Sequence, residues 1–381
     1  MKEQLTTLFN QCVNNSQSMR ERLQKDAIGT TSPTERVITR RFNVSETAEL
    51  VGVARAAIDQ AEKDGRLPPP DRNEHGAKLG YTLYQIQRMR ELFGTALVQP
   101  HAVTVAVASN KGGAYKTSVA VHAAQRFALL GYRVLLIDSD PQGTAGDYFG
   151  WSSRWVDGGK TIAPWMLGRE QSLAYAIHPT CWPGIDLIPA NQELQRIDKE
   201  MDKLELPYPP HLMLRAGIET ISANYDLVII DGAPNLADGT IAQVFAADVL
   251  ICPTPAEVHD TASTEQFFSL LRDITSAVPD EDVWAIPDVR ILVTKLANVA
   301  GSSSQKVKEE IHKAWGGMVL ANPVRVTEEV GKAQIRMRTV YEQDRSERSS
   351  PSAWKNACGM WDALFTEVNE TLLKPRWGAS A

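Results

Sequence analysis

The chain has 381 residues, a net charge of −6 and 43% hydrophobic residues, an ordinary composition for a globular protein with room for two or three domains. The charge excludes a uniformly basic nucleic-acid binder, and no apolar run reaches the length of a membrane span. The N-terminal residues 1–11 are too polar for a secretion signal. The four cysteines are scattered without a Cys-x-x-Cys pair, which predicts neither a zinc nor an iron–sulfur site and favours the cytoplasm.

The charge is unevenly distributed along the chain. Residues 1–100 contain 14 Lys and Arg against 12 Asp and Glu, so the acidic excess lies in the remainder. Any contact with DNA must therefore come from local basic patches.

Residues 1–28 have the apolar spacing of an amphipathic helix. The apolar positions are Leu5, Leu8, Phe9, Cys12, Val13, Met19 and Leu23. Such a stripe must pack on its own domain or on a partner subunit, and residues 29–33 then indicate a linker. We expect residues 1–32 to form a dimerisation helix and its linker.

Residues 33–100 are predicted to form a winged helix-turn-helix domain. Ser45 is expected to cap a first helix that runs through Leu50, and Gly52 makes a tight turn. A second helix is predicted over 55–63, a loop or wing over 67–80 and a third helix over 81–93.

The second helix would enter the major groove of DNA and present Arg55, with Asp59 and Gln60 nearby. The phosphate contacts are expected from Arg66, Arg72 and Lys78. A small helical domain with a purely structural role is the alternative, because a helix-turn-helix pattern is a weak signal by itself.

From residue 101 onward, short apolar strands alternate with helical stretches. Strands are predicted over 103–110, 133–140, 185–190, 226–231, 249–253 and 289–294. This alternation predicts an α/β fold with a mostly parallel, doubly wound sheet over 101–381, and ligands bind at the carboxyl ends of such strands.

A glycine-containing loop joins the first of these strands to a helix predicted over 119–130. Its sequence is Lys111-Gly112-Gly113-Ala114-Tyr115-Lys116-Thr117-Ser118. Backbone N–H groups would cradle a triphosphate, Lys116 would reach the outer phosphates, and the Thr117 hydroxyl would bind Mg2+. Lys111 and Tyr115 stand where a common P-loop has glycines, so we expect Lys111 to point at a second subunit's nucleotide. The alternative is a plain glycine turn with solvated lysines.

Two further strands end in carboxylates. Asp138 and Asp140 follow the second strand, where Asp138 is expected to support Mg2+ near Thr117 and Asp140 to position the attacking water. Asp231 ends a later strand in the Walker B arrangement and is expected to hold Mg2+ through water. The alternative for the first pair is a turn with aspartate caps.

Together these motifs resemble the deviant Walker ATPases of the ParA/MinD group over residues 101–381. The matching elements are Lys111-Gly-Gly-x-x-Lys116-Thr117, Asp138-x-Asp140-Pro-Gln-Gly and Asp231. Tyr115 and the helix-turn-helix are similar to the large plasmid and prophage partition proteins, the SopA-like branch of ParA. Ala114 stands where the family often has valine, a small change.

The resemblance implies an ATPase that binds ATP or ADP with Mg2+ and forms an ATP-dependent homodimer. Catalysis would use Lys111, Lys116 and Asp140, with Lys111 reaching the other subunit's phosphates. It further implies stimulation by a ParB-type centromere-binding partner, binding to nonspecific chromosomal DNA, and repression of its own operon by the ADP-bound form through specific operator DNA. The protein would be cytoplasmic and associated with the nucleoid. A transcription regulator that uses nucleotide only as a conformational ligand is the alternative.

The C-terminal part adds a nucleotide pocket and a basic segment. In this fold Pro253, Thr294 and Pro323 are expected to line the adenine pocket. Residues 332–355 have a positive net charge. The resemblance implies that they form the surface that binds DNA without sequence preference. These basic residues are Lys332, Arg336, Arg338, Arg345, Arg348 and Lys355. Solvated side chains in internal salt bridges are the alternative.

The last helix, over 353–373, is expected to pack in the core. Its apolar positions are Trp354, Trp361, Phe365, Val368 and Leu372. Membrane binding, as in MinD-type relatives, is disfavoured because Asp362, Glu367 and Glu370 are expected to face solvent and would repel anionic lipid.

Overall fold

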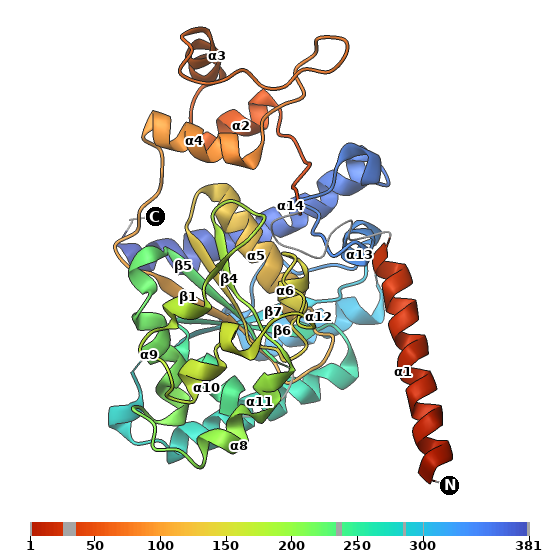
Figure 1. The fold of residues 1–381 in the computed structure, drawn as a ribbon, viewed down its shortest axis with the longest axis vertical. Helices are drawn as coiled ribbons and strands as arrows, with labels where there is room; N and C mark the ends of the chain where they lie inside the picture. The colour runs from red at the N-terminus through yellow and green to blue at the C-terminus, as the bar shows by residue number, and fades with distance from the viewer. Residues whose placement is uncertain (1, 26–35, 234–237, 285–286, 300, 379–381) are drawn as a thin grey trace.

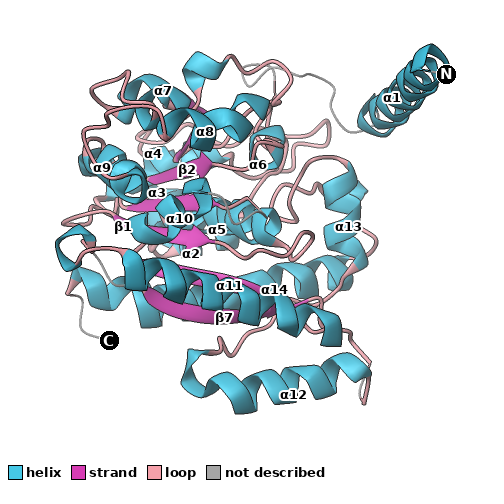
Figure 2. Cartoon of the chain, turned by 90° about the horizontal axis from the view of Figure 1, so that it is seen from below, coloured by secondary structure: helices cyan, strands magenta, loops and turns pink. Residues whose placement is uncertain are grey.

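The computed structural model describes residues 2–25, 36–233, 238–284, 287–299 and 301–378. Its centre is a seven-stranded sheet in the order β3-β4-β2-β5-β1-β6-β7, with helices on both faces (Figure 2). Every pair is parallel except the short edge pair β3–β4. The strands are β1 (Val103–Val107), β2 (Val134–Asp138), β3 (His178–Pro179), β4 (Ile185–Ile188), β5 (Leu227–Asp231), β6 (Val249–Pro255) and β7 (Asp288–Thr294). The predicted mostly parallel α/β sheet is therefore confirmed.

Alternate residues of the buried strands face two separate cores, as the period of a strand requires. In β1, Val103 and Val105 join the cluster under α5, whereas Ala106 joins the cluster on the opposite face. The helices of this α/β unit are α5 (Lys116–Leu130), α6 (Thr144–Asp147), α7 (Ala163–Met166), α8 (Ile197–Met201), α9 (Met213–Glu219), α10 (Asp238–Ala246), α11 (Val258–Ala277), α12 (Ser303–Trp315), α13 (Glu328–Ile335) and α14 (Pro351–Val368).

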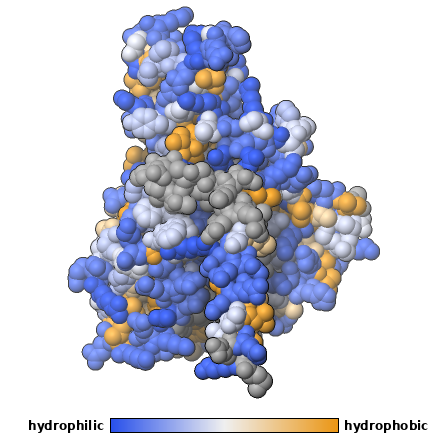
Figure 3. All heavy atoms as spheres, turned by 45° about the vertical axis from the view of Figure 1, so that its right-hand side comes forward, coloured by the Kyte–Doolittle hydropathy of each residue, from blue (hydrophilic) through white to orange (hydrophobic). Residues whose placement is uncertain are grey.

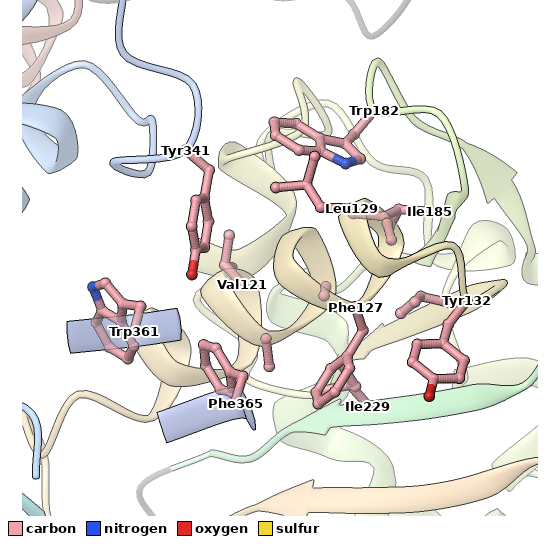
Figure 4. Close-up of a cluster of buried hydrophobic side chains, with 14 of the residues drawn as sticks. Val121, Phe127, Leu129, Tyr132, Trp182, Ile185, Ile229, Tyr341, Trp361 and Phe365 are labelled. Atoms are coloured by element: carbon pink, nitrogen blue, oxygen red, sulfur yellow. The ribbon is translucent and has the colours of Figure 1, made fainter. Parts of the chain in front are cut away.

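The last helix, α14, packs against α5 through aromatic side chains (Figure 4). Trp361 and Phe365 are fully buried and stacked with ring centroids 5.7 Å apart. The predicted core role of this helix is confirmed by its buried aromatic side chains. Asp362 and Glu367 are partly exposed, and each has partners within the chain. Asp362 accepts a hydrogen bond from the Tyr341 hydroxyl, and Glu367 accepts the backbone N–H groups of residues 321 and 322. Fixed donors from neighbouring loops hold these carboxylates at the protein surface.

His122 of α5 is a buried titratable group in this core. Its ring stacks on Trp361 at 4.1 Å, and Nδ1 donates to the Ser118 carbonyl at 2.7 Å. Complete burial lowers the pKa of His122 to about 3. The folded state therefore keeps the imidazole neutral in the range where the unfolded chain takes up a proton.

This burial predicts a specific loss of stability in acid. Because an unfolded histidine has a pKa of about 6.5, the stabilisation is present above that pH and is lost as pH falls toward the folded pKa. Between pH 7 and pH 5 the loss should be about 2 kcal/mol. His122→Phe retains a ring against Trp361 but has no group that titrates in this range. We therefore expect its free energy of unfolding, measured in urea, to fall by about 2 kcal/mol less between pH 7 and pH 5 than that of the wild type. An identical pH dependence of the two proteins would contradict this assignment.

A separate lobe precedes the α/β unit and contains α2 (Val44–Val51), α3 (Arg55–Lys63) and α4 (Leu83–Phe93) (Figure 1). The side of this lobe shown in Figure 3 is mostly hydrophilic. Asn43, not Ser45, caps α2: its side chain accepts the N–H groups of residues 45 and 46, and Glu46 completes a capping box. The prediction of Ser45 is wrong because the helix begins earlier, at Val44, and Asn43 is an equally good cap.

Residues 67–80 of the lobe form a loop with isolated bridges and no strand, consistent with the loop of the predicted loop or wing. Arg72 and Lys78 make an antiparallel bridge across a turn, and Phe42 bridges Tyr81. The guanidinium of Arg90 in α4 donates to the carbonyls of Leu50 and Leu129, at the C-terminal ends of α2 and α5. A cation at two helix C-termini is electrostatically favourable, and it joins the lobe to the helix that follows the P-loop.

The N-terminal helix α1 (Lys2–Lys25) extends away from the rest of the chain (Figure 1). Five apolar side chains of this helix are each more than half exposed: Leu5, Leu8, Phe9, Val13 and Met19. The predicted linker over 29–33 lies outside the described residues. None of the described helices is both long and apolar enough to cross a membrane.

Candidate nucleotide site

The loop between β1 and α5 has the backbone of a phosphate cradle. Gly113 has φ 70° and Tyr115 has φ 73°, and α5 begins at Lys116. A left-handed conformation costs a non-glycine residue about 1–2 kcal/mol. The Tyr115 ring packs against the hydrophobic core, which offsets that cost. This explains how a tyrosine occupies a position where glycine is usual without changing the turn.

Lys116 lies inside the curve of this loop and is almost completely buried. Its Nζ donates to the Lys111 carbonyl at 2.8 Å. Burial lowers the pKa of Lys116, while the carboxylates of Asp231 and Asp140 act to raise it. A desolvated ammonium at a helix N-terminus suits a phosphate, which would replace the loop carbonyl as its partner.

Asp138 and Asp231 are register partners on the adjacent strands β2 and β5, and both are fully buried. Burial raises the pKa of Asp231 to about 7, with Asp140 adding to the rise and the nearby Thr117 hydroxyl and Lys116 opposing it. The pKa of Asp138 is also raised, first by burial and then by Asp231. Two carboxylates in one dry site are costly unless a cation compensates them.

The carboxylate oxygens at this site fit a divalent cation. Asp138 accepts the N–H groups of Asp140 and Gly146, at 3.2 and 2.9 Å. No backbone N–H among the described residues donates to the Asp231 carboxylate, and the Thr117 hydroxyl lies beside it. An oxygen set of a hydroxyl and carboxylates is what Mg2+ prefers, so the residues present suit that ion.

Asp140 lies at the rim of the same edge and is partly exposed. One carboxylate oxygen accepts the Gln142 N–H at 2.9 Å, which is the aspartate-capped turn of the alternative interpretation. This turn does not prevent Asp140 from acting on the nucleotide site, because its charge also acts to raise the pKa of the buried Lys116 ammonium.

Lys111 points out of the cradle to the first turn of α11. Its Nζ lies 2.7 Å from Asp260 Oδ1, and Asp260 is only 3% exposed. Sequence reasoning missed Asp260, because nothing in the sequence around it marks a site. Lys295 directly follows Thr294 at the end of β7, a position expected to line the adenine pocket; its φ is 52°, and its Nζ would lie 4.0 Å from a Cβ placed on Gly113.

Of the residues predicted to line the adenine pocket, Thr294 contacts the P-loop directly, and the other two are located by the strands beside them. Thr294 donates its hydroxyl to the Ala114 carbonyl of the loop at 3.2 Å, and Pro253 lies in β6. Pro323 precedes Val324, whose N–H bonds to Val293 of β7. The Ser118 hydroxyl instead accepts Gln334 Nε2 at 2.8 Å, which ties α5 to α13.

The basic residues predicted to contact DNA divide into paired and unpaired side chains. Carboxylates lie within 4 Å of the paired group, consisting of Arg66, Lys78, Lys332, Arg336 and Arg338. Arg72 donates to the Gly76 carbonyl, and Arg348 lies 3.4 Å from the centre of the Trp354 ring. Within the described part of the chain, Arg55, Arg345 and Lys355 have no carboxylate partner and are exposed. These three are the cations most available to phosphates.

Residues 102–281 match the family model described as "AAA domain". Protein SopA of Escherichia coli K12 is 49% identical over 385 residues, covering 98% of this chain and 99% of its own. The chain belongs to the ParA-type plasmid partition ATPases, in the SopA branch.

Solved structures show the same fold. One titled "Partition Protein" aligns with a TM-score of 0.66 at 17% identity, over 96% of this chain and 98% of its own. The cobyrinic acid a,c-diamide synthase of Mycobacterium smegmatis, solved with an ATP analog and magnesium, aligns with a TM-score of 0.52 at 25% identity, over 62% of this chain and 95% of its own. The match to "Partition Protein" extends over the N-terminal lobe as well as the sheet.

Proposed function

We propose that this protein is a Mg2+-dependent ATPase that drives plasmid partition. The observation that carries the proposal is Asp231, a fully buried carboxylate to which no backbone N–H among the described residues donates. Asp231 ends β5, the strand that pairs with β1, and the P-loop with Lys116 follows β1. The cobyrinic acid a,c-diamide synthase of Mycobacterium smegmatis, which has the same fold, was solved with a bound ATP analog and magnesium. Phosphate binding by the loop and cation binding by the carboxylates would satisfy both buried charges at once.

Each part of the site has a role in ATP hydrolysis. The backbone of residues 111–118 and the start of α5 would bind the phosphates, with Lys116 neutralising their charge. Thr117, Asp138 and Asp231 would hold Mg2+, which when bound supplies positive charge to the phosphate oxygens. Asp140 would orient the attacking water and accept its proton. Thr294, Pro253 and Pro323 would surround the adenine.

The oligomeric state is part of the same proposal. ATP would bring two subunits together, so that Lys111 of each reaches the phosphates bound by the other. The exposed apolar stripe of α1 would bury itself in a second contact between subunits. In this proposal the chain has three parts. Residues 1–32 form the dimerisation helix and its linker, residues 33–100 form a winged helix-turn-helix domain, and residues 101–381 form the ATPase domain.

DNA binding would have two modes. Arg55, Arg66, Arg72 and Lys78 of the lobe would contact a specific operator, making the protein a repressor of its own operon. The ATP-bound dimer would bind chromosomal DNA without sequence preference through the segment 332–355, and a ParB-type protein would stimulate hydrolysis. Such phosphate contacts weaken with salt, and they would keep the protein on the nucleoid in the cytoplasm.

A turnover assay tests this function directly. We expect slow release of phosphate from ATP by the protein alone and a clear rise when DNA and the ParB-type partner are both added. Absence of stimulated turnover, with nucleotide-dependent operator binding intact, would favour a transcription regulator without a motor role. Sedimentation with anionic liposomes in ATP is the control for a MinD-like function, and binding there would contradict the DNA assignment.

A further inference from the structure

Arg36 lies at the start of residues 36–42, the segment that leads into the N-terminal lobe. Its side chain is only 10% exposed. Nη2 donates to the Met337 carbonyl at 2.7 Å and to the Glu342 carboxylate at 2.9 Å, and Nη1 donates to the Asp147 carbonyl at 3.3 Å. One guanidinium therefore joins this segment to two parts of the α/β unit that are far apart in the chain.

The Asp147 carbonyl belongs to the turn that shapes the candidate Mg2+ site. Asp147 is the last residue of α6, which follows the motif that begins at Asp138. The N–H of Gly146, one residue earlier, donates to Asp138 Oδ2 at 2.9 Å. A Cβ on Gly146 would lie 2.4 Å from the Trp151 carbonyl oxygen, so the turn has no room to shift toward that residue. The backbone that holds the Asp138 carboxylate is thus itself held, one residue later, by Arg36.

Glu342 extends the contact of Arg36 to the helix that begins in the P-loop. It is only 3% exposed, and its Oε1 accepts a hydrogen bond from Gln125 Nε2 at 2.8 Å. Gln125 is fully buried in α5, whose first residue is Lys116. Burial acts to lower the pKa of Arg36, but the charge of Glu342 outweighs it and the pKa is raised, so the pair is ionised. Arg36 is therefore fixed relative to both α5 and the turn after β2.

The rest of the segment 36–42 is also fastened to the α/β unit. The Thr39 hydroxyl donates to the Asp344 carboxylate, and the Arg40 guanidinium donates to the Tyr341 carbonyl at 2.7 Å. Two residues beyond this segment the chain enters α2 of the lobe. A displacement of the turn after β2 can therefore reach the lobe through a segment that side chains hold along its length.

We propose, on the basis of the proposed function, that Arg36 is a positioning residue that couples the binding of Mg2+ and nucleotide at Asp138 to operator binding by the lobe. When the Asp138 carboxylate turns toward bound Mg2+, the turn that donates to it must follow. Arg36 passes this displacement to residues 36–42 and so changes the orientation of the lobe. Because coupling between two sites is reciprocal, operator DNA should raise nucleotide affinity by the same factor by which nucleotide raises operator affinity.

The first test uses Arg36→Lys, which keeps a cation beside Glu342 but cannot reproduce the fork that also reaches the Asp147 carbonyl. DNA from directly upstream of the protein's own gene is titrated by fluorescence anisotropy, with and without ADP and Mg2+. In the wild type the affinity should rise at least about fivefold with ADP, whereas in Arg36→Lys it should change by less than about twofold. An unchanged response to ADP in Arg36→Lys would overturn the coupling.

Arg41→Ala is the matched control for this test. Arg41 lies on the same segment as Arg36, but its guanidinium pairs with Asp71 of the lobe at 2.9 Å. Any direct effect of a lost positive charge on DNA binding cancels in the ratio of affinities with and without ADP. Arg41→Ala should therefore keep the ratio of the wild type, and loss of the ratio in this variant as well would overturn the specific role of Arg36.

The second test removes the ion pair without leaving a buried charge uncompensated. Arg36→Met combined with Glu342→Gln should remain folded in circular dichroism melting and should also lose the response to ADP. Isothermal titration calorimetry measures the reverse effect, in which operator DNA should raise ADP affinity in the wild type but in neither variant. A response of the wild-type size in this double variant would overturn the coupling.

Hydrogen exchange separates failure of this inference from failure of the proposed function. In the nucleotide-free protein, the peptide 143–150 should exchange at least roughly threefold faster in Arg36→Lys than in the wild type, because the turn has lost a fixed contact. Equal exchange would overturn the hold of Arg36 on the turn. If operator binding by the wild type does not respond to nucleotide, the repressor role in the proposed function fails instead, and the exchange rates alone judge the hold.

Discussion

Lys116→Ala should abolish nucleotide binding. Lys116 is the buried ammonium at the start of α5, and its Nζ donates to the Lys111 carbonyl at 2.8 Å. Charge-assisted hydrogen bonds to phosphate are worth about 1.5–3 kcal/mol each, so losing them should weaken affinity for a Mg2+-ATP analog at least about 100-fold. Isothermal titration calorimetry measures this loss, and circular dichroism melting confirms that the variant is folded.

Lys111→Ala is the matched comparison, because both lysines belong to one loop. Lys111 points away from the cradle to Asp260, so its removal should retain nucleotide binding far better than Lys116→Ala. It should nevertheless lose hydrolysis or productive dimer formation. Equal loss of nucleotide affinity in the two variants would reduce Lys111 to an ordinary phosphate ligand and contradict its role between subunits.

Much of the nucleotide site was predictable because parallel strands end at one edge of a sheet. Asp138 and Asp231 end the second and fifth strands in the chain, yet they become direct register partners when β2 and β5 pair. The alternation of strands and helices was sufficient to predict that their carboxylates meet near Lys116. Helix α3 has the bounds that its apolar spacing and flanking turns predict.

Contacts between distant parts of the chain were not predictable from local patterns. The sequence of a strand predicts where the strand ends, but not which helix turn lies against a loop from another part of the chain. The contact between Asp260 of α11 and Lys111 of the P-loop was therefore not predictable. Arg336 and Arg338 appeared as free cations in a basic run, yet both lie within 3 Å of Glu347, which the local fold brings back beside them. The short strand β3 contains only two residues, too few for an alternating pattern to be visible.

The pairing of Arg336 and Arg338 with Glu347 also bears on the proposed DNA surface over 332–355. Because these ion pairs are only partly exposed, they compete with DNA phosphates for the same guanidinium groups. The unpaired Arg345 and Lys355 need no such exchange. Within the segment 332–355, sequence-independent binding should therefore depend more on these two residues than on the count of basic side chains.

Asp140→Ala should leave ATP binding and dimer formation intact but block turnover. Asp140 lies at the rim of the site, where it can orient water, and it is not expected to ligate the nucleotide or Mg2+. Loss of a general base lowers rates by about 10²–10⁴-fold. We expect at least about a 100-fold fall in phosphate release with DNA and partner present, and nucleotide affinity within about threefold of the wild type.

The turn that Asp140 makes must be separated from its chemical role. Its Oδ1 atom accepts the Gln142 N–H, so Asp140→Ala removes a turn contact as well as a carboxylate. Asp140→Asn retains an oxygen that can accept this hydrogen bond but cannot take a proton from water. If both variants lose turnover equally, the carboxylate acts on the water. If Asp140→Asn hydrolyses ATP at the wild-type rate, Asp140 serves only the turn, and the water must be activated by another group at this edge of the sheet.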